Sequence, residues 1–295
     1  MPRAAANGIE IEYDTFGDRS DPPLLLVMGL GAQMIAWDER LCRLLADRGH
    51  FVVRYDNRDS GLSTKVDWST DDFMAAFAAA WAEQPIDAPY LLSDMAADGV
   101  GLLDALDIPA AHVVGASMGG MIAQTIAIEH PDRVLTLTSI MSTTGDRDVG
   151  QPTAEAMEVL LTRPPAEREA SIEQMVRASR VIGSPVHFDE EAARERSALA
   201  YDRCYFPVGT GRQLLAVLAS GSRAEALRRL AVPTLVIHGE VDPLVPVSGG
   251  RRTAELVPGA RLVVLPDMGH DLPPVLWPTI VDAIAEHTAR VPVTR

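Results

Sequence analysis

Short runs of apolar residues recur along this chain, and the segments between most of them carry helical patterns. The runs cover residues 24–30, 51–56, 112–117, 134–140, 234–239 and 261–266. Each run is almost continuously apolar, which is typical of a strand covered on both faces. Strands that alternate with helices form a mostly parallel sheet, because each crossover returns the chain to the same end of the sheet. We therefore expect an α/β fold with a central sheet flanked by helices.

Two local signals give finer expectations. Residues 8–17 alternate between apolar and polar side chains, with Glu10, Glu12 and Asp14 on one side. We expect an edge strand there whose acidic side faces water. Ser93 has the residue type of an N-cap, so a helix is expected to begin at this serine.

The alternation is interrupted at residues 143–229, which contain several helical patterns and no convincing strand. Connections of this length are uncommon in compact domains, so we expect a helical cap laid over the sheet. The chain then divides into a first core part at 1–142, the cap, and a second core part at 230–295. In the alternative interpretation, these helices simply thicken the core. A shorter interruption at residues 66–90 lengthens another connection.

The pentapeptide Gly-Ala-Ser-Met-Gly at residues 115–119 joins an apolar strand to a helical segment. A G-x-S-x-G sequence in this context predicts a nucleophile elbow, in which the serine hydroxyl projects from a sharp turn. Gly115 and Gly119 leave room around that turn, and the following helix directs its first amides toward Ser117. Because a serine hydroxyl is a weak nucleophile alone, this hypothesis requires a base and an orienting acid.

The chain offers an acid and a base in the order that such enzymes use. Asp242 follows the strand at 234–239, and His270 follows the last strand. His270 would accept the proton of Ser117, and Asp242 would fix the tautomer of the imidazole. Asp267 and Asp271 flank His270 closely, and we interpret them as solvated or capping residues.

An acyl-transfer site also needs donors for a developing oxyanion. The first should be the backbone N–H of Met118, which follows the nucleophile. The second should come from Leu30, which lies between Gly29 and Gly31 in the loop after the strand LLLVMG. The alternative is that these glycines form an ordinary turn between a strand and a helix.

Charge and cysteine content exclude other classes of function. The formal net charge is −15, which disfavours nucleic acid as a partner. Cys42 and Cys204 are too few and too far apart for a disulfide framework or a metal site, so we expect two buried thiols and no metal. The N-terminus lacks a signal-peptide pattern, and no apolar stretch reaches the roughly 20 residues that cross a bilayer. We expect a cytoplasmic protein that does not bind membranes.

Several segments together resemble the α/β-hydrolase superfamily, specifically its capped serine esterases, and are similar to the aclacinomycin methylesterases. They read LLLVMGLG, VVRYDNRDSGLS, HVVGASMGGMIAQ, PTLVIHGEVDPLVP and LPDMGHDLP. The resemblance implies the α/β-hydrolase fold and assigns the triad and the two oxyanion donors to the residues named above. Two features depart from the family pattern: Met28 stands where many relatives have histidine, and residues 59–61 read DSG where many have Gly-x-Gly. We interpret Asp56 and Arg58 as a structural ion pair.

The leading hypothesis is a serine hydrolase that cleaves carboxylic esters through an acyl-enzyme without a cofactor. Ser117 argues against the family members that use a carboxylate at the elbow. Hydrolysis of C–C bonds, opening of lactones and perhydrolysis need only the same triad and remain alternatives, as does a non-catalytic receptor for small molecules. An apolar, Met-rich and Ala-rich cap favours a small hydrophobic ester. Residues near strand ends should line its pocket: Met28, Met34, Trp37 and Met141.

Overall fold

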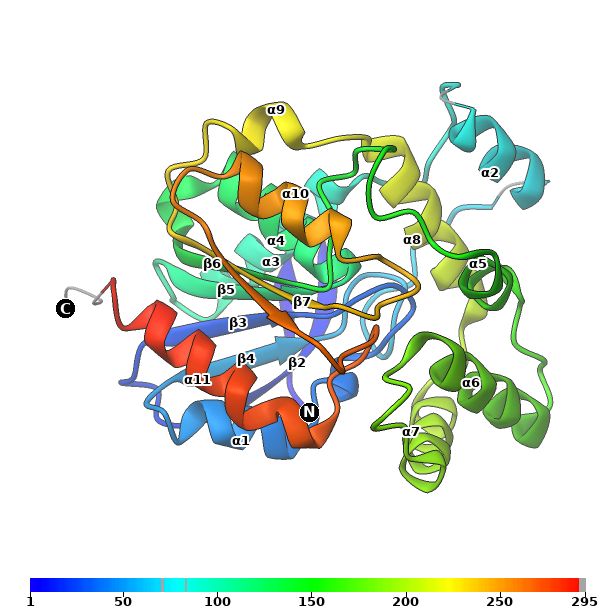
Figure 1. Ribbon diagram of the computed structural model, residues 1–295, viewed down its shortest axis with the longest axis horizontal. Helices are drawn as coiled ribbons and strands as arrows, with labels where there is room; N and C mark the ends of the chain where they lie inside the picture. The colour runs from blue at the N-terminus through cyan, green and yellow to red at the C-terminus, as the bar shows by residue number, and fades with distance from the viewer. Residues whose placement is uncertain (70–71, 83, 292–295) are drawn as a thin grey trace.

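An eight-stranded sheet forms the centre of the molecule (Figure 1). The computed structural model describes residues 1–69, 72–82 and 84–291. The strands, in spatial order, are β1 (Arg3–Ala6), β2 (Ile9–Phe16), β4 (Phe51–Tyr55), β3 (Pro23–Val27), β5 (Ala111–Ala116), β6 (Val134–Ile140), β7 (Thr234–Gly239) and β8 (Arg261–Leu265). The pairs β1–β2 and β2–β4 are antiparallel, and all other pairs are parallel. The mostly parallel sheet expected from the sequence is confirmed.

Helices cover both faces of this sheet (Figure 1). One face carries α1 (Glu39–Ala46) and α11 (Trp277–Thr288), and the other carries α3 (Leu92–Ala105), α4 (Met118–Glu129), α9 (Ala224–Leu227) and α10 (Ser248–Leu256). In β3, Leu24 and Leu26 pack toward α1 and α11, whereas Leu25 and Val27 pack toward α3 and α4. Both faces of the central strands are therefore buried, which explains their continuous apolar sequences.

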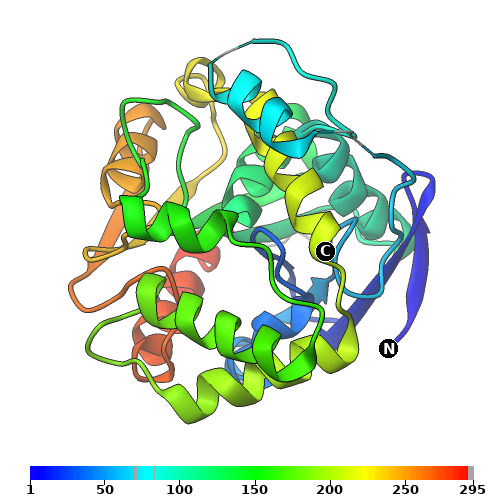
Figure 2. The same cartoon turned by 90° about the vertical axis from the view of Figure 1, so that its right-hand side faces the viewer.

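The remaining helices lie at one side of the sheet. They are α2 (Phe73–Trp81), α5 (Ala154–Leu161), α6 (Arg168–Ile182), α7 (Glu190–Arg203) and α8 (Pro207–Ser220). Figure 2 shows α5 to α8 facing the viewer. Short 3₁₀ turns complete the fold at Met34–Ala36, Pro131–Arg133 and Pro274–Leu276. Among the helices of the described ranges, none has both the length and the apolar character needed to cross a bilayer.

Two local expectations were wrong. The strand at residues 9–16 is not at the edge, because β1 pairs with its outer side. Glu12 is therefore buried and accepts a hydrogen bond from Arg3 Nε at 2.8 Å, instead of facing water. Ser93 is not an N-cap either: α3 begins one residue earlier, and the carboxylate of Asp94 accepts the Leu91 N–H at 2.8 Å. The sequence of β1 has no alternating apolar pattern, so it did not predict the strand that pairs with β2. It also did not show that Asp94 would accept the Leu91 N–H at the start of α3.

Candidate active site

Ser117 occupies a strained turn between β5 and α4. Its backbone has φ +58° and ψ −124°, a combination that non-glycine residues rarely adopt. Neighbouring glycines are required for this turn, because a Cβ at Gly115 would lie 2.0 Å from the carbonyl oxygen of Gly119. A Cβ at Gly119 would lie 2.1 Å from the carbonyl oxygen of Val27. The close packing of β5, α4 and β3 therefore depends on both positions being glycine.

Two loops bring a histidine and a carboxylate to this serine. His270 follows β8, and its Nε2 lies 2.9 Å from Oγ of Ser117. Asp242 follows β7, and its Oδ2 lies 2.7 Å from Nδ1 of His270. Nδ1 therefore donates to Asp242, and Nε2 is left to accept the proton of the Ser117 hydroxyl. The structure brings together the three side chains that the sequence singled out.

The carboxylate of Asp242 is fixed from its other side. Its Oδ1 accepts the backbone N–H groups of Leu244 at 2.9 Å and Val245 at 2.8 Å. A second histidine, His238, lies 3.7 Å from Oδ2 but donates from Nε2 to the carbonyl oxygen of Val245 at 2.7 Å. Burial lowers the pKa of His238, so its imidazole stays neutral. Oδ2 is thus directed toward His270 alone.

The two other acidic residues near His270 do not contact its imidazole. Asp267 is exposed. Asp271 is half-buried, and its Oδ1 accepts the N–H of Ser184, which follows α6, at 3.0 Å. Burial raises the pKa of Asp271. The interpretation of Asp267 as a solvated residue agrees with this placement, whereas Asp271 connects the loop after β8 to the segment after α6.

Two backbone amides near Ser117 are free to donate. Within the described residues, neither the N–H of Leu30 nor that of Met118 has a hydrogen-bond acceptor. The loop after β3 lies against the serine, since a Cβ built at Gly29 would lie 2.9 Å from Cβ of Ser117 and 3.3 Å from its Oγ. The N–H of Met118 opens α4, where the helix dipole favours negative charge. This geometry fits an oxyanion hole, and that role stays a prediction.

The residues expected to line a pocket are all buried. Met28, Trp37 and Met141 belong to the hydrophobic cluster beneath α1 and α11. Met34 is fully buried, and its N–H donates to Oδ1 of Asp56 at 2.7 Å. The contact of these four side chains with substrate stays a prediction.

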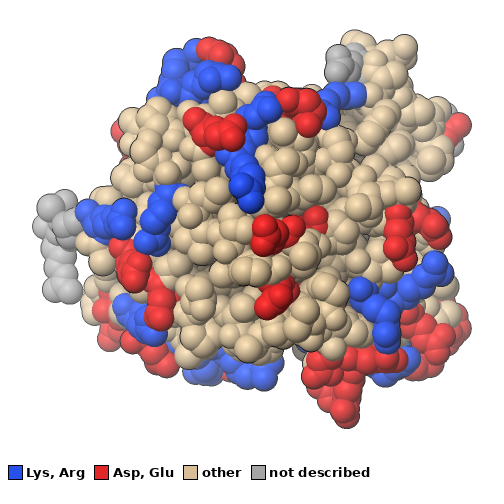
Figure 3. Space-filling view, in the orientation of Figure 1, with Lys and Arg blue, Asp and Glu red and all other residues tan. Residues whose placement is uncertain are grey.

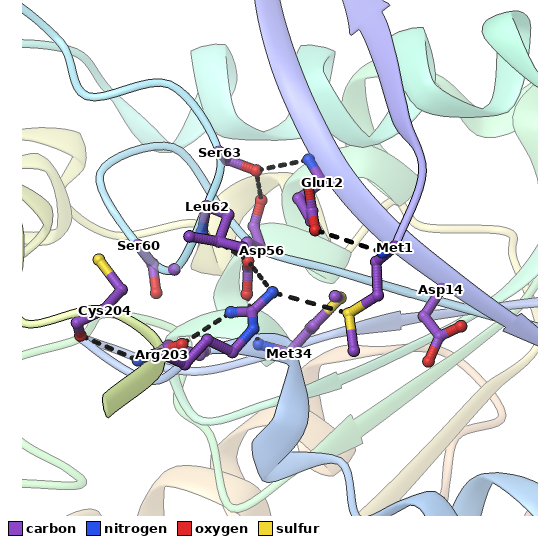
Figure 4. A network of polar contacts seen from close by, with 12 residues as sticks. Met1, Glu12, Asp14, Met34, Asp56, Ser60, Leu62, Ser63, Arg203 and Cys204 are labelled. Carbon is purple, nitrogen blue, oxygen red and sulfur yellow. Dashed lines mark hydrogen bonds and ion pairs between the residues drawn. The ribbon is translucent and has the colours of Figure 1, made fainter. Parts of the chain in front are cut away.

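The expectation that Asp56 and Arg58 form an ion pair was wrong. Arg58 instead donates to both carboxylate oxygens of Asp98, at 2.6 Å each. Asp56 pairs with Arg203 of α7 at 2.7 Å (Figure 4). Each residue therefore pairs with a helix that lies elsewhere in the sequence, α3 for Arg58 and α7 for Asp56. The expected ion pair had been inferred from the closeness of Asp56 and Arg58 in the sequence.

Neither cysteine is placed for metal binding. Both thiols are free; Cys42 is buried, and burial raises the pKa of its thiol to about 12. Cys204 is half-buried, contrary to the expectation of two buried thiols. In ranges 1–69, 72–82 and 84–291, no three His, Cys, Asp or Glu side chains gather closely enough to hold a metal ion.

Most of the chain matches one protein family. A family model described as an alpha/beta hydrolase fold matches residues 22–274. The chain belongs to this alpha/beta hydrolase family. All three of Ser117, Asp242 and His270 lie within the matched region of the family model. The fold and the family expected from the sequence are confirmed.

Family members with related sequences have several hydrolytic activities. A rhodomycin D methylesterase from Streptomyces sp. (strain C5) is 32% identical, with 92% of each chain covered. A 2-hydroxymuconate semialdehyde hydrolase from Pseudomonas sp. (strain CF600) is 31% identical over 91% of this chain and 83% of the relative. The solved structure of a meta-cleavage product hydrolase from Pseudomonas fluorescens IP01 has a TM-score of 0.78 and 22% identity, covering 99% and 98% of the two chains. The likeness to the solved structure shows the shared fold.

Sequence patterns missed the side chains that hold the loop after β3. Asn57 donates from Nδ2 to the carbonyl oxygen of Met28 at 2.8 Å. Gln213, on α8, accepts the N–H of Gly31 at 2.8 Å. Neither residue has a sequence signal of its own, because an Asn in a loop and a Gln in a helix are usual at surfaces. Only the packing of distant segments reveals them.

Proposed function

We propose that this family member is a serine hydrolase that cleaves carboxylic esters of small hydrophobic substrates through an acyl-enzyme, without a cofactor. The observation that carries the proposal is the hydrogen-bonded series Ser117–His270–Asp242 at the strained turn. A hydroxyl in contact with a neutral imidazole, itself oriented by a buried carboxylate, is the arrangement that activates serine as a nucleophile.

The reaction follows from these positions. Oγ of Ser117 attacks the ester carbonyl carbon, and its proton moves to Nε2 of His270. The negative oxygen of the tetrahedral intermediate accepts hydrogen bonds from the N–H groups of Leu30 and Met118. The C–O bond to the alcohol then breaks, and His270 returns the proton to that alcohol. Water attacks the acyl-enzyme by the same route, releasing the acid and restoring Ser117.

A neutral, apolar substrate fits the charge of the protein. The net charge of −15 repels anionic partners, and nucleic acid is not an expected ligand. On the face drawn in Figure 3, the described Lys and Arg side chains are interspersed with Asp and Glu and form no continuous basic strip.

We further propose that residues 143–229 act as a cap that controls access to Ser117. The expected location is the cytoplasm, and cell fractionation tests it.

Hydrolysis of a C–C bond or of a lactone is the second candidate. Among the relatives, one at 31% identity is named a 2-hydroxymuconate semialdehyde hydrolase, and one at 25% identity is named a 3-oxoadipate enol-lactonase. The same triad serves these reactions, so the residues of the site do not separate them. A non-catalytic receptor would need no intact triad and is disfavoured by the hydrogen bonds described above.

A substrate panel tests the proposal. The wild type and Ser117→Ala would be assayed with methyl and phenyl esters of short and medium acids, an enol-lactone, and a vinylogous 1,5-diketone acid. We expect ester turnover that is lost in the folded Ser117→Ala protein. Turnover of the diketone acid alone would replace the proposal by C–C hydrolysis, and binding without any turnover would replace it by a receptor.

A further inference from the structure

The loop that carries the Leu30 amide is held by a buried side chain of α8. Oε1 of Gln213 accepts the N–H of Gly31 at 2.8 Å, and its Nε2 donates to the carbonyl oxygen of Arg58 at 2.8 Å. The Gln213 side chain is completely buried, at 0% exposure. One amide group therefore connects α8 to the loop after β3 and to the loop after β4.

The contact between α8 and this loop is close. Gly31 has φ +66°, and a Cβ at this position would lie 2.5 Å from Oγ1 of Thr210, also on α8. Gly29 and Gly31 flank Leu30, so the isolated loop would sample many backbone conformations. A fixed acceptor for the Gly31 N–H removes that freedom next to the peptide unit of Leu30.

A second helix holds the same loop from the other end. Nε2 of Gln33 donates to the carbonyl oxygens of Ala200, at 2.7 Å, and Cys204, at 3.1 Å. Arg203 donates to Oε1 of Gln33 at 2.7 Å and also reaches Oδ2 of Asp56 at 2.7 Å. Figure 4 shows Arg203 between Asp56 and the end of α7. The loop is therefore held between α7 and α8.

We propose that Gln213 is a positioning residue for the oxyanion hole. The inference rests on the proposed function, because it assigns the Leu30 N–H to the oxyanion. By fixing the N–H of Gly31, Gln213 sets the backbone angles of Leu30 and keeps its N–H directed at the reacting carbonyl. Gln213→Met nearly keeps the length of the side chain and removes the acceptor of the Gly31 N–H. The substitution is therefore expected to change the orientation of the loop after β3.

The test compares Gln213→Met with Gln174→Met as a matched control. Gln174 lies on α6, is half-buried, and its Nε2 donates to the carbonyl oxygen of Thr162 at 2.8 Å. Both variants and the wild type would be assayed with phenyl acetate and with its thiono analogue, in which sulfur replaces the carbonyl oxygen. Sulfur is a poor hydrogen-bond acceptor, so the rate ratio of the two esters reports on the oxyanion contacts.

We expect Gln213→Met to lower kcat for phenyl acetate by about 10- to 100-fold with little change in KM. The ratio of the oxygen to the sulfur ester should shrink by a similar factor, and Gln174→Met should match the wild type. A purely structural role would lower both rates equally and leave the ratio unchanged, which would overturn the inference.

Two further outcomes are separable. If the wild type hydrolyses neither ester, the proposed function itself fails. If Gln213→Met does not fold, Gln213→Asn, which shortens the side chain by one methylene, is measured in the same way. An unchanged kcat and an unchanged ratio in folded Gln213→Asn would then overturn the inference.

Discussion

Nε2 of His270 lies 2.9 Å from Oγ of Ser117, although 153 positions separate the two residues in the chain. Parallel strands place their carboxyl ends at one edge, so the loops after β5, β7 and β8 meet there. The contact requires the register of the sheet, the strained turn at Ser117 and the backbone N–H of His270, which donates to the carbonyl oxygen of Ile182 at 2.7 Å. These three features of the described fold together position His270 and Ser117.

Asp242→Asn should reduce kcat by a factor of about 10⁴, because an amide facing Nδ1 favours the wrong imidazole tautomer. The protein should remain folded, since the side chain keeps its shape. Steady-state kinetics with an activated ester measures the change. Asp267→Asn, at an exposed position in the same loop as His270, is the control and should leave kcat unchanged. The reverse pattern would show that Asp267 is the acid.

Gly119→Ala should destabilise the protein by about 3 kcal/mol, since the new Cβ would lie 2.1 Å from a backbone oxygen of β3. The control is Gly211→Ala in α8, where the nearest atom is a ring carbon of Phe73 at 3.1 Å. That ring can move, and alanine favours a helix by about 1 kcal/mol, so a change within about 1 kcal/mol is expected. Urea unfolding measures both. Equal effects would mean that the elbow tolerates a larger residue.

Arg203→Met should lower the free energy of unfolding by about 3 kcal/mol, because it removes the ion-pair partner of the buried Asp56 carboxylate. The Asp56 side chain is 0% exposed and that of Arg203 is 11% exposed. Arg168→Met is the control: it removes an ion pair with Asp202 in which the two side chains are 42% and 52% exposed, and should cost at most about 1 kcal/mol. Comparable losses in urea unfolding would contradict the structural role of the pair in Figure 4.

Acid should destabilise the fold through buried histidines. Burial lowers the pKa of His112 from 6.5 to about 4, and burial also lowers the pKa values of His50 and His287. Between pH 6.5 and about 4, the unfolded chain binds a proton that folded His112 does not, so stability falls as the pH falls. The contribution of His112 is about 2 kcal/mol at pH 5 relative to pH 8.

His112→Gln should reduce this loss by about the same amount, because glutamine can still bond to Oγ1 of Thr136 and does not titrate. Urea unfolding at pH 8 and pH 5 measures the difference. His130→Gln, at the half-buried end of α4, is the control and should keep the acid loss of the wild type. An unchanged acid loss in His112→Gln would contradict the assignment.

Local patterns were sufficient for the parts of the fold that local physics determines. The strands at residues 134–140 and 234–239 have the expected bounds, because both faces of these strands are buried and every position must be compatible with a core. The elbow was recognisable since only glycine fits at 115 and 119. The loops with Asp242 and His270 followed from the order of the strands.

Contacts between distant segments could not be predicted from such patterns. Asp56 binds an arginine 147 positions later, on a helix whose sequence is rich in charge and resembles a solvated surface. Gln213 contacts Gly31 across 182 positions. The backbone pairing of β1 involves three alanines with no alternating pattern. These partners are brought together by tertiary packing, and the periodicity of the sequence contains no information about it.

The role of Ser117 as the nucleophile is tested by reaction with a fluorophosphonate, with the modified residue identified by peptide mass spectrometry. We predict one adduct per chain, on Ser117, with ester hydrolysis lost in proportion to labelling. The folded Ser117→Ala protein should then neither react nor turn over an ester. An adduct on any other residue, or ester turnover retained by Ser117→Ala, would contradict the assignment of Ser117 as the nucleophile.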